Sequence, residues 1–242
     1  MSHQRRQPLL HRSAVSYVEN SGLRALVQLI PQVGGAIDAL FAGKGAAIQQ
    51  DRLNSFLETL DQRIRMIENK SPHSWSTESE ELYDFFLITL TDAIRIRSAK
   101  KRECLARLAA SQVVHPRAWS QAEAAERILA SLEEVHIEVL LEVSNAPEVL
   151  GVWRGARVIM INSPDDPSAI NPTYLPDRLP GYQLTMLRLA CAELLAKGLL
   201  LDEGGGRLSA RSMTYFVISD LGKWFLEWLY TEQCSSGDLS PV

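Results

Sequence analysis

Apolar residues recur at intervals of three and four along the first half of the chain, which is the period of an amphipathic helix. This pattern predicts one helix over residues 51–69 and another over residues 82–94. A basic turn, 95–102, follows, and the apolar pattern then continues to residue 109. The apolar face of the first helix is formed by Leu53, Phe56, Leu57, Leu60, Ile64 and Ile67.

The region after residue 119 also has a helical pattern and a signal for a helix start. Ser131 and Glu134 have the spacing at which a hydroxyl and a carboxylate bond the free amides of a first turn. We therefore predict a helix that begins near residue 132 and ends before Pro147. His136 shares a face of this helix with Leu132, so we interpret it as a half-buried structural histidine.

Short β-branched segments appear only beyond this helix. RVIMIN at 157–162 predicts a strand, and the proline-rich stretch 163–181 predicts a long turn with at most one or two helical turns. A helix is expected over 182–197, ended by Gly198, which tolerates the backbone conformation of a helix terminus.

The final part of the chain predicts a hairpin and a closing helix. Residues 199–202 and 214–218 are apolar and flank a turn that starts with three glycines from Gly204, so we expect them to pair antiparallel. Ser219 then has the side chain of an N-cap for the last helix.

The most apolar stretch of the chain is 23–48, and Pro31 and the pair Gly34-Gly35 interrupt it. Proline removes a helical donor and glycine weakens a helix, so two short helices with a bend are expected. Its polar residues argue against a transmembrane span. Residues 1–22 are polar and basic, which predicts a flexible arm.

These elements predict a mainly α protein, with an N-terminal helical bundle followed by a winged-helix domain that contains a small antiparallel β-hairpin. We place the arm at 1–22, the bundle at 23–118 and the winged helix at 119–242. LTMLRLACAELLAKGLLL at 184–201 and YFVISDLGKWF at 215–225 resemble the joints of bacterial winged-helix proteins. Together with 81–145, this part resembles the abortive-infection proteins of the Abi-alpha type. That resemblance implies phage defence and supplies no catalytic residue.

Charge and cysteine content bear on the compartment and on the partners. Residues 1–70 hold nine basic and six acidic residues, a net +3, whereas 71–145 and 146–242 carry −4 and −3. Non-specific electrostatic binding of nucleic acid is therefore not expected. Three widely spaced cysteines and a polar N-terminus indicate a reducing cytoplasm.

No residue pattern predicts catalysis, a metal site or a cofactor. Asp165 and Asp166 follow a strand, as a nuclease carboxylate would, but a second acid and a lysine on a neighbouring strand are missing, and PDDP is typical of a turn. We therefore predict that the protein is not an enzyme.

Two surfaces are candidates for binding. A winged helix that reads DNA would use its 182–198 helix and its hairpin, that is, Arg188, Lys197, Arg207 and Arg211. Residues 23–48 would either be buried against the neighbouring helices or lie on an anionic membrane surface. In the second case the contacts come from Leu29, Ile30, Val33, Ile37, Leu40 and Phe41.

These observations favour a non-enzymatic interaction or regulatory protein that binds a protein partner or itself. The N-terminal helices would act as effector or oligomerisation unit, in a cytoplasmic protein that contacts the inner membrane peripherally if the membrane hypothesis holds. The alternative is a winged-helix transcriptional regulator that binds DNA.

Overall fold

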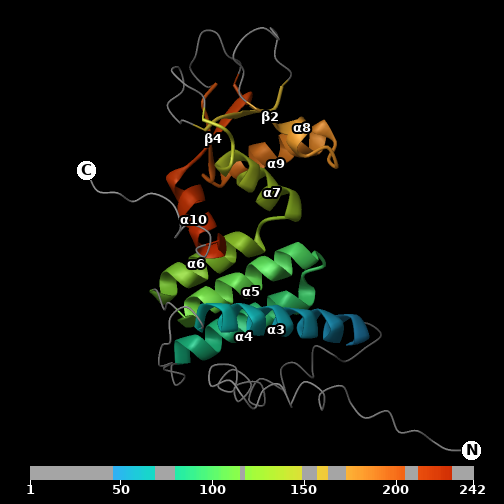
Figure 1. The fold of residues 1–242 in the computed structure, drawn as a ribbon, viewed down its shortest axis with the longest axis vertical. Helices are drawn as coiled ribbons and strands as arrows, with labels where there is room; N and C mark the ends of the chain where they lie inside the picture. The colour runs from blue at the N-terminus through green and yellow to red at the C-terminus, as the bar shows by residue number, and fades with distance from the viewer. Residues whose placement is uncertain are drawn as a thin grey trace, which may run out of the picture. The chain divides into compact units, whose positions relative to one another are not determined.

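The computed structural model describes residues 46–68, 80–114, 118–148, 157–162, 173–204 and 212–230, and its arrangement is drawn in Figure 1. Helices make up 72% of these residues, so the prediction of a mainly helical protein is confirmed. The helices are α3 (Ala46–Glu68), α4 (Glu80–Arg95), α5 (Ala99–Val114), α6 (Trp119–Ala130), α7 (Glu134–Ser144), α8 (Leu175–Arg178), α9 (Leu184–Ala196) and α10 (Asp220–Tyr230). The strands are β1 (Ile159–Met160), β2 (Thr173–Tyr174), β3 (Leu200–Asp202) and β4 (Tyr215–Ile218).

The chain forms two compact units, residues 1–127 and residues 128–242. The division falls inside α6, whereas the sequence placed the domain boundary at the beginning of that helix, between residues 118 and 119. Each unit is described below by itself.

In the first unit, α3 packs against both α4 and α5, which also contact each other (Figure 1). The predicted apolar face of α3 is buried at Phe56, Leu60 and Ile64. Phe85 of α4 meets Trp119 of α6 with ring centroids 6.0 Å apart. The burial of these aromatic and aliphatic side chains stabilises the unit through the hydrophobic effect.

The start of α7 differs from the prediction. Ser131 does not cap this helix, because its hydroxyl donates to the carbonyl of Ile128 at 2.8 Å. The helix begins at Glu134, and Nδ1 of His136 accepts the backbone N–H of Glu133 at 2.9 Å. A histidine three residues into the helix thus satisfies an amide that has no partner within the helix.

The second unit contains a four-stranded sheet in the order β2-β1-β4-β3. β3 and β4 pair antiparallel, with Leu200 opposite Ile218, so the predicted hairpin is confirmed. β1 lies within the predicted strand and pairs antiparallel with β4. β2 pairs parallel with β1. It lies in the stretch 163–181, which the sequence predicts to be a turn, so that prediction is partly wrong. A two-residue strand is too short to show an alternating pattern.

The joint between α9, β3 and α10 is tightly built. Gly198 follows α9 with φ +72°, a left-handed conformation that suits glycine and ends the helix as predicted. The hydroxyl of Ser219 accepts the N–H of Gly222 at 2.9 Å and donates to the Gly198 carbonyl at 2.6 Å. The predicted N-cap is confirmed, and the same side chain ties α10 to the end of α9.

Candidate functional site

The residues predicted to contact DNA are only partly described by the structure. Arg188 and Lys197 lie on α9 or directly after it and are exposed, whereas Arg207 and Arg211 lie outside the described residues. The same holds for the predicted membrane residues Leu29, Ile30, Val33, Ile37, Leu40 and Phe41, and for Asp165 and Asp166. In the described ranges, no helix combines the length and the apolar character that a bilayer crossing requires.

Arg188 forms a hydrogen bond with a residue that follows β1. Its Nη2 donates to Oδ1 of Asn162 at 2.7 Å, and Nδ2 of Asn162 donates to the hydroxyl of Thr214 at 3.0 Å. These bonds connect α9 to the ends of β1 and β4. Lys197 follows the C-terminal end of α9, about two and a half turns beyond Arg188, whereas helices that read DNA present their N-terminal residues to the bases. The two described cations therefore form no common patch.

The exposed side of α9 is instead apolar at two positions. Met186 is 46% exposed and Leu189 is 52% exposed, although both have long hydrophobic side chains. The opposite face of the helix is buried at Leu187, Cys191 and Leu194. The sequence analysis did not select Met186 and Leu189. Their position outside the buried stripe was a signal that could have identified them.

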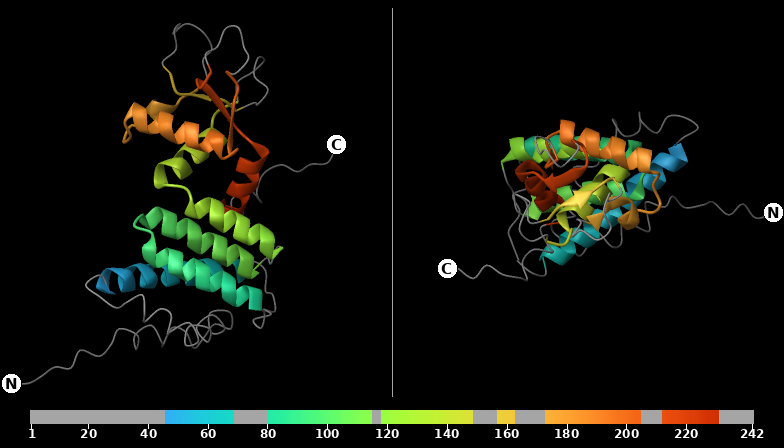
Figure 2. Two further views of the ribbon diagram at one scale, coloured as in Figure 1. Left: turned by 180° about the vertical axis from the view of Figure 1, so that it is seen from behind. Right: turned by 90° about the horizontal axis from the view of Figure 1, so that it is seen from above.

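Glu193 occupies the same exposed side and contacts α7, which packs against α9 and lies next to it in the left view of Figure 2. Its Oε2 is 2.8 Å from Nε2 of His136. Since Nδ1 of this histidine accepts the Glu133 amide, the N–H of the neutral ring is on Nε2, and the contact of Nε2 with the carboxylate does not have the alignment of a hydrogen bond. His136 is 5% exposed, more buried than predicted, and its contacts are those of a structural residue.

The acidic residues of α7 bind the segment that leads into α9. Glu142 accepts from Nε of Arg178 at 2.8 Å. Burial and a hydrogen bond with Glu138 raise the pKa of Tyr182 to about 12. These contacts fix α8 and the start of α9 on α7, so the orientation of the exposed α9 face is set by polar as well as apolar contacts.

Asp202 at the end of β3 organises the hairpin. Its Oδ1 accepts the N–H of Gly204 at 2.9 Å, and its Oδ2 accepts the N–H of Met213 at 2.7 Å. Met213 has φ +59°, an unusual value for a residue with a side chain. Because the carboxylate is occupied by backbone amides, Asp202 has a structural role in this hairpin.

The first unit contains a buried carboxyl group, Glu126 on α6, which is 8% exposed. Burial, together with a hydrogen bond and the negative charge of Asp92, raises its pKa to about 8, against the opposing charges of Arg127 and Lys101. Two neighbouring carboxyl groups that retain a proton are a common feature of acid–base sites. In the described parts of the chain, however, no cluster of side chains suited to a metal ion accompanies this pair.

The chain was compared with protein-family models, characterised proteins and solved structures, and none of the three comparisons gives a significant match.

Proposed function

We propose that residues 128–242 form a winged-helix module, joined to an N-terminal helical bundle. The order of elements supports this assignment: α7, β1, the short strand β2, α8, α9, the β3–β4 hairpin and finally α10. The pairing of β1 with β4 also supports it, because the first strand of the module then extends the hairpin into a small sheet. The module would be an interaction unit without catalytic activity.

The proposed partner of α9 is a protein surface, and a second copy of this chain is the partner to test first. The observation that carries this proposal is the exposure of Met186 and Leu189 on the side of α9 that faces solvent. Binding is stabilised when a partner removes long apolar side chains from water. Arg188, the cation at the centre of the helix, is already bonded to Asn162, which makes phosphate contact by this side chain less favourable.

Light scattering over a range of protein concentrations tests self-association through this face. We expect the wild-type mass to rise with concentration and the double variant Met186→Gln/Leu189→Gln to remain a monomer. Ile88→Gln is the matched control, because Ile88 is 44% exposed on α4 in the other unit. If the control and the double variant behave alike, α9 is not the contact surface.

A DNA-binding measurement tests the alternative function. We expect no binding of random-sequence double-stranded DNA in fluorescence anisotropy at low salt, where phosphate contacts are strongest. If the wild-type protein binds and the variants of the predicted cations do not, the regulator hypothesis is correct. Those variants are Arg188→Ala, Lys197→Ala, Arg207→Ala and Arg211→Ala.

The cellular role that we propose is phage defence, with the helical N-terminal part as effector or oligomerisation unit. The resemblance of residues 81–145 and the C-terminal part to Abi-alpha proteins supports this role. Phage plating on bacteria that express the full chain tests it, with Met186→Gln/Leu189→Gln as comparison. We expect the wild type to reduce plaque numbers and the variant to lose this effect.

A further inference from the structure

The end of α4, the connection to α5 and the first turn of α5 are together strongly cationic. The predicted turn over 95–102 is limited to residues 96–98 in the structure. Residues 95–102 contain five arginine and lysine residues and no carboxylate. Arg95 and Arg97 in this segment are exposed. Arg52 of α3 reaches the same place, since its Nη1 donates to the carbonyls of Ile94 at 3.0 Å and Arg95 at 3.3 Å. We call Arg52, Arg95, Arg97 and Arg102 the basic corner.

Two of these arginines donate hydrogen bonds to the backbone carbonyls at and just after the C-terminal end of α4. Arg52 bonds two carbonyls at the helix terminus, and Nη1 of Arg102 donates to the carbonyls of Ile96 and Arg97, each at 3.0 Å. Carbonyls at a helix C-terminus carry partial negative charge that repels anions. Because guanidinium groups cover them, the corner presents positive charge even though a helix ends there.

The guanidinium groups of the corner also act on each other. Burial, followed by the positive charge of Arg52, lowers the pKa of Arg102. The contribution of Arg52 to this shift reflects repulsion between two cations that bond neighbouring backbone carbonyls. A bound anion would relieve this repulsion, because opposite charges at short distance favour the charged form of each group.

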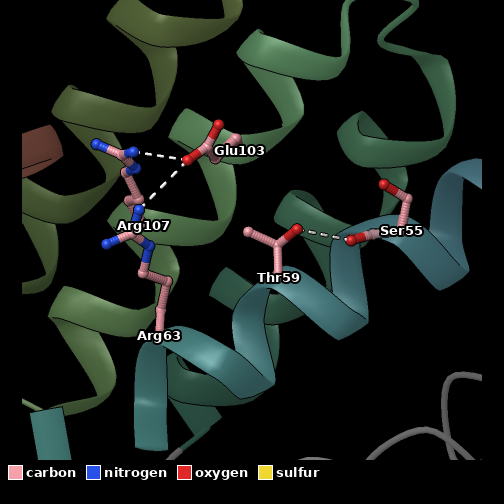
Figure 3. Close-up of polar contacts among 5 residues, drawn as sticks. All are labelled: Ser55, Thr59, Arg63, Glu103 and Arg107. Atoms are coloured by element: carbon pink, nitrogen blue, oxygen red, sulfur yellow. Dashed lines mark hydrogen bonds and ion pairs between the residues drawn. The ribbon is translucent and has the colours of Figure 1, made fainter. Parts of the chain in front are cut away.

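Elsewhere in the same unit, Arg63 and Arg107 form ion pairs with a carboxylate, which the arginines of the basic corner do not within the described residues. Figure 3 shows the carboxylate of Glu103 between Arg107 and Arg63, with distances from Oε1 to their Nη2 atoms of 2.6 Å and 3.3 Å. Ser55 and Thr59, also drawn, are bonded within α3. Over the described ranges, neither Arg95 nor Arg97 forms an ion pair with a carboxylate.

We propose that the basic corner binds the phosphate headgroups of an anionic lipid membrane. Arginine offers several N–H donors in a planar fork that fits phosphate oxygens. An apolar neighbour distinguishes a lipid surface from nucleic acid. Ile48, one helical turn before Arg52, is 58% exposed, and it is the last residue of the apolar stretch 23–48 in the sequence. Cationic and apolar side chains together suit a membrane interface.

Vesicle flotation of the full chain tests the proposal, using vesicles of phosphatidylcholine alone and vesicles of equal parts phosphatidylcholine and phosphatidylglycerol. We expect binding to the anionic vesicles only. The variant Arg95→Gln/Arg97→Gln should bind them about 25-fold more weakly, at roughly fivefold for each cation near an anionic surface. Both side chains are exposed, so circular dichroism should show an unchanged fold.

The matched control is Lys197→Gln/Lys223→Gln, which removes the same charge from exposed positions of the other unit. It should bind like the wild type. An equal loss in both double variants would mean that net charge alone governs binding and would overturn the proposal. So would wild-type binding to neutral vesicles as strong as to anionic ones, or no binding to either. DNA that binds to the corner in place of the anionic vesicles would identify a nucleic-acid surface instead.

Discussion

The buried carboxyl group of Glu126 makes the stability of the helical unit depend on pH. Its pKa is raised from 4.5 to about 8, first by burial and then by the hydrogen bond and charge of Asp92. Between these two values the folded protein retains a proton that the unfolded chain has released. The free energy of unfolding is therefore highest below the lower value and decreases as the pH rises through this window.

The magnitude follows from the size of the shift. One pKa unit corresponds to about 1.36 kcal/mol, and pH 7 lies about 2.5 units above the ordinary pKa and below the raised one. Keeping the proton in the folded state should therefore lower the free energy of unfolding at pH 7 by about 3 kcal/mol, relative to its value below the ordinary pKa. Glu126→Gln has a similar shape and does not titrate. We expect this variant to lose most of the decrease and to be more stable than the wild type at neutral pH.

Urea denaturation followed by circular dichroism, from about pH 5 to about pH 8, measures this dependence. Glu123→Gln is the control, because Glu123 lies on the exposed side of the same helix and undergoes the same change from a carboxyl group to an amide. The control should retain the wild-type slope. A wild-type free energy of unfolding that is constant over this range, or an equal slope in Glu126→Gln, would refute the reasoning.

Two further substitutions test the construction of the second unit. A Cβ atom at Gly222 would come 2.3 Å from the backbone oxygen of Leu199, so Gly222→Ala should lower the free energy of unfolding by about 1–3 kcal/mol. Gly181→Ala, with open space at that position, should change it little, and equal effects would contradict the close approach. Asp202→Ala removes the acceptor of the Met213 amide, so hydrogen exchange at that amide should accelerate by about tenfold or more. Unchanged exchange would exclude this role of the carboxylate.

The sequence was most informative where the local structure depends on residues that are close together in the sequence. The apolar period predicted α3, α4 and α9, because one side of each helix must be buried. Gly198 and Ser219 predicted a helix end and a helix start, since each acts on backbone groups within a few residues. The hairpin followed from two apolar segments on either side of a glycine-rich turn.

The exposed apolar residues of α9 could have been found by the same reasoning. Met186 and Leu189 fall outside the stripe formed by Leu187, Cys191 and Leu194, and long apolar side chains outside the buried stripe of a helix are a signal for an interaction surface. The basic corner was visible in part, as the charged segment 95–102. Nothing in that segment indicated that Arg52 would join it.

Only the tertiary structure decided which distant groups meet. Arg52 bonds the end of a helix 42 and 43 residues further along the chain, and Asn162 bonds Thr214 across 52 residues. The burial of Glu126 beside Asp92 and the pairing of β2 with β1 are of the same kind. A local pattern determines the conformation of a segment and the side that it buries. The pKa of a carboxyl group, or the partner of an arginine, depends on atoms that only the packing of separate segments brings together.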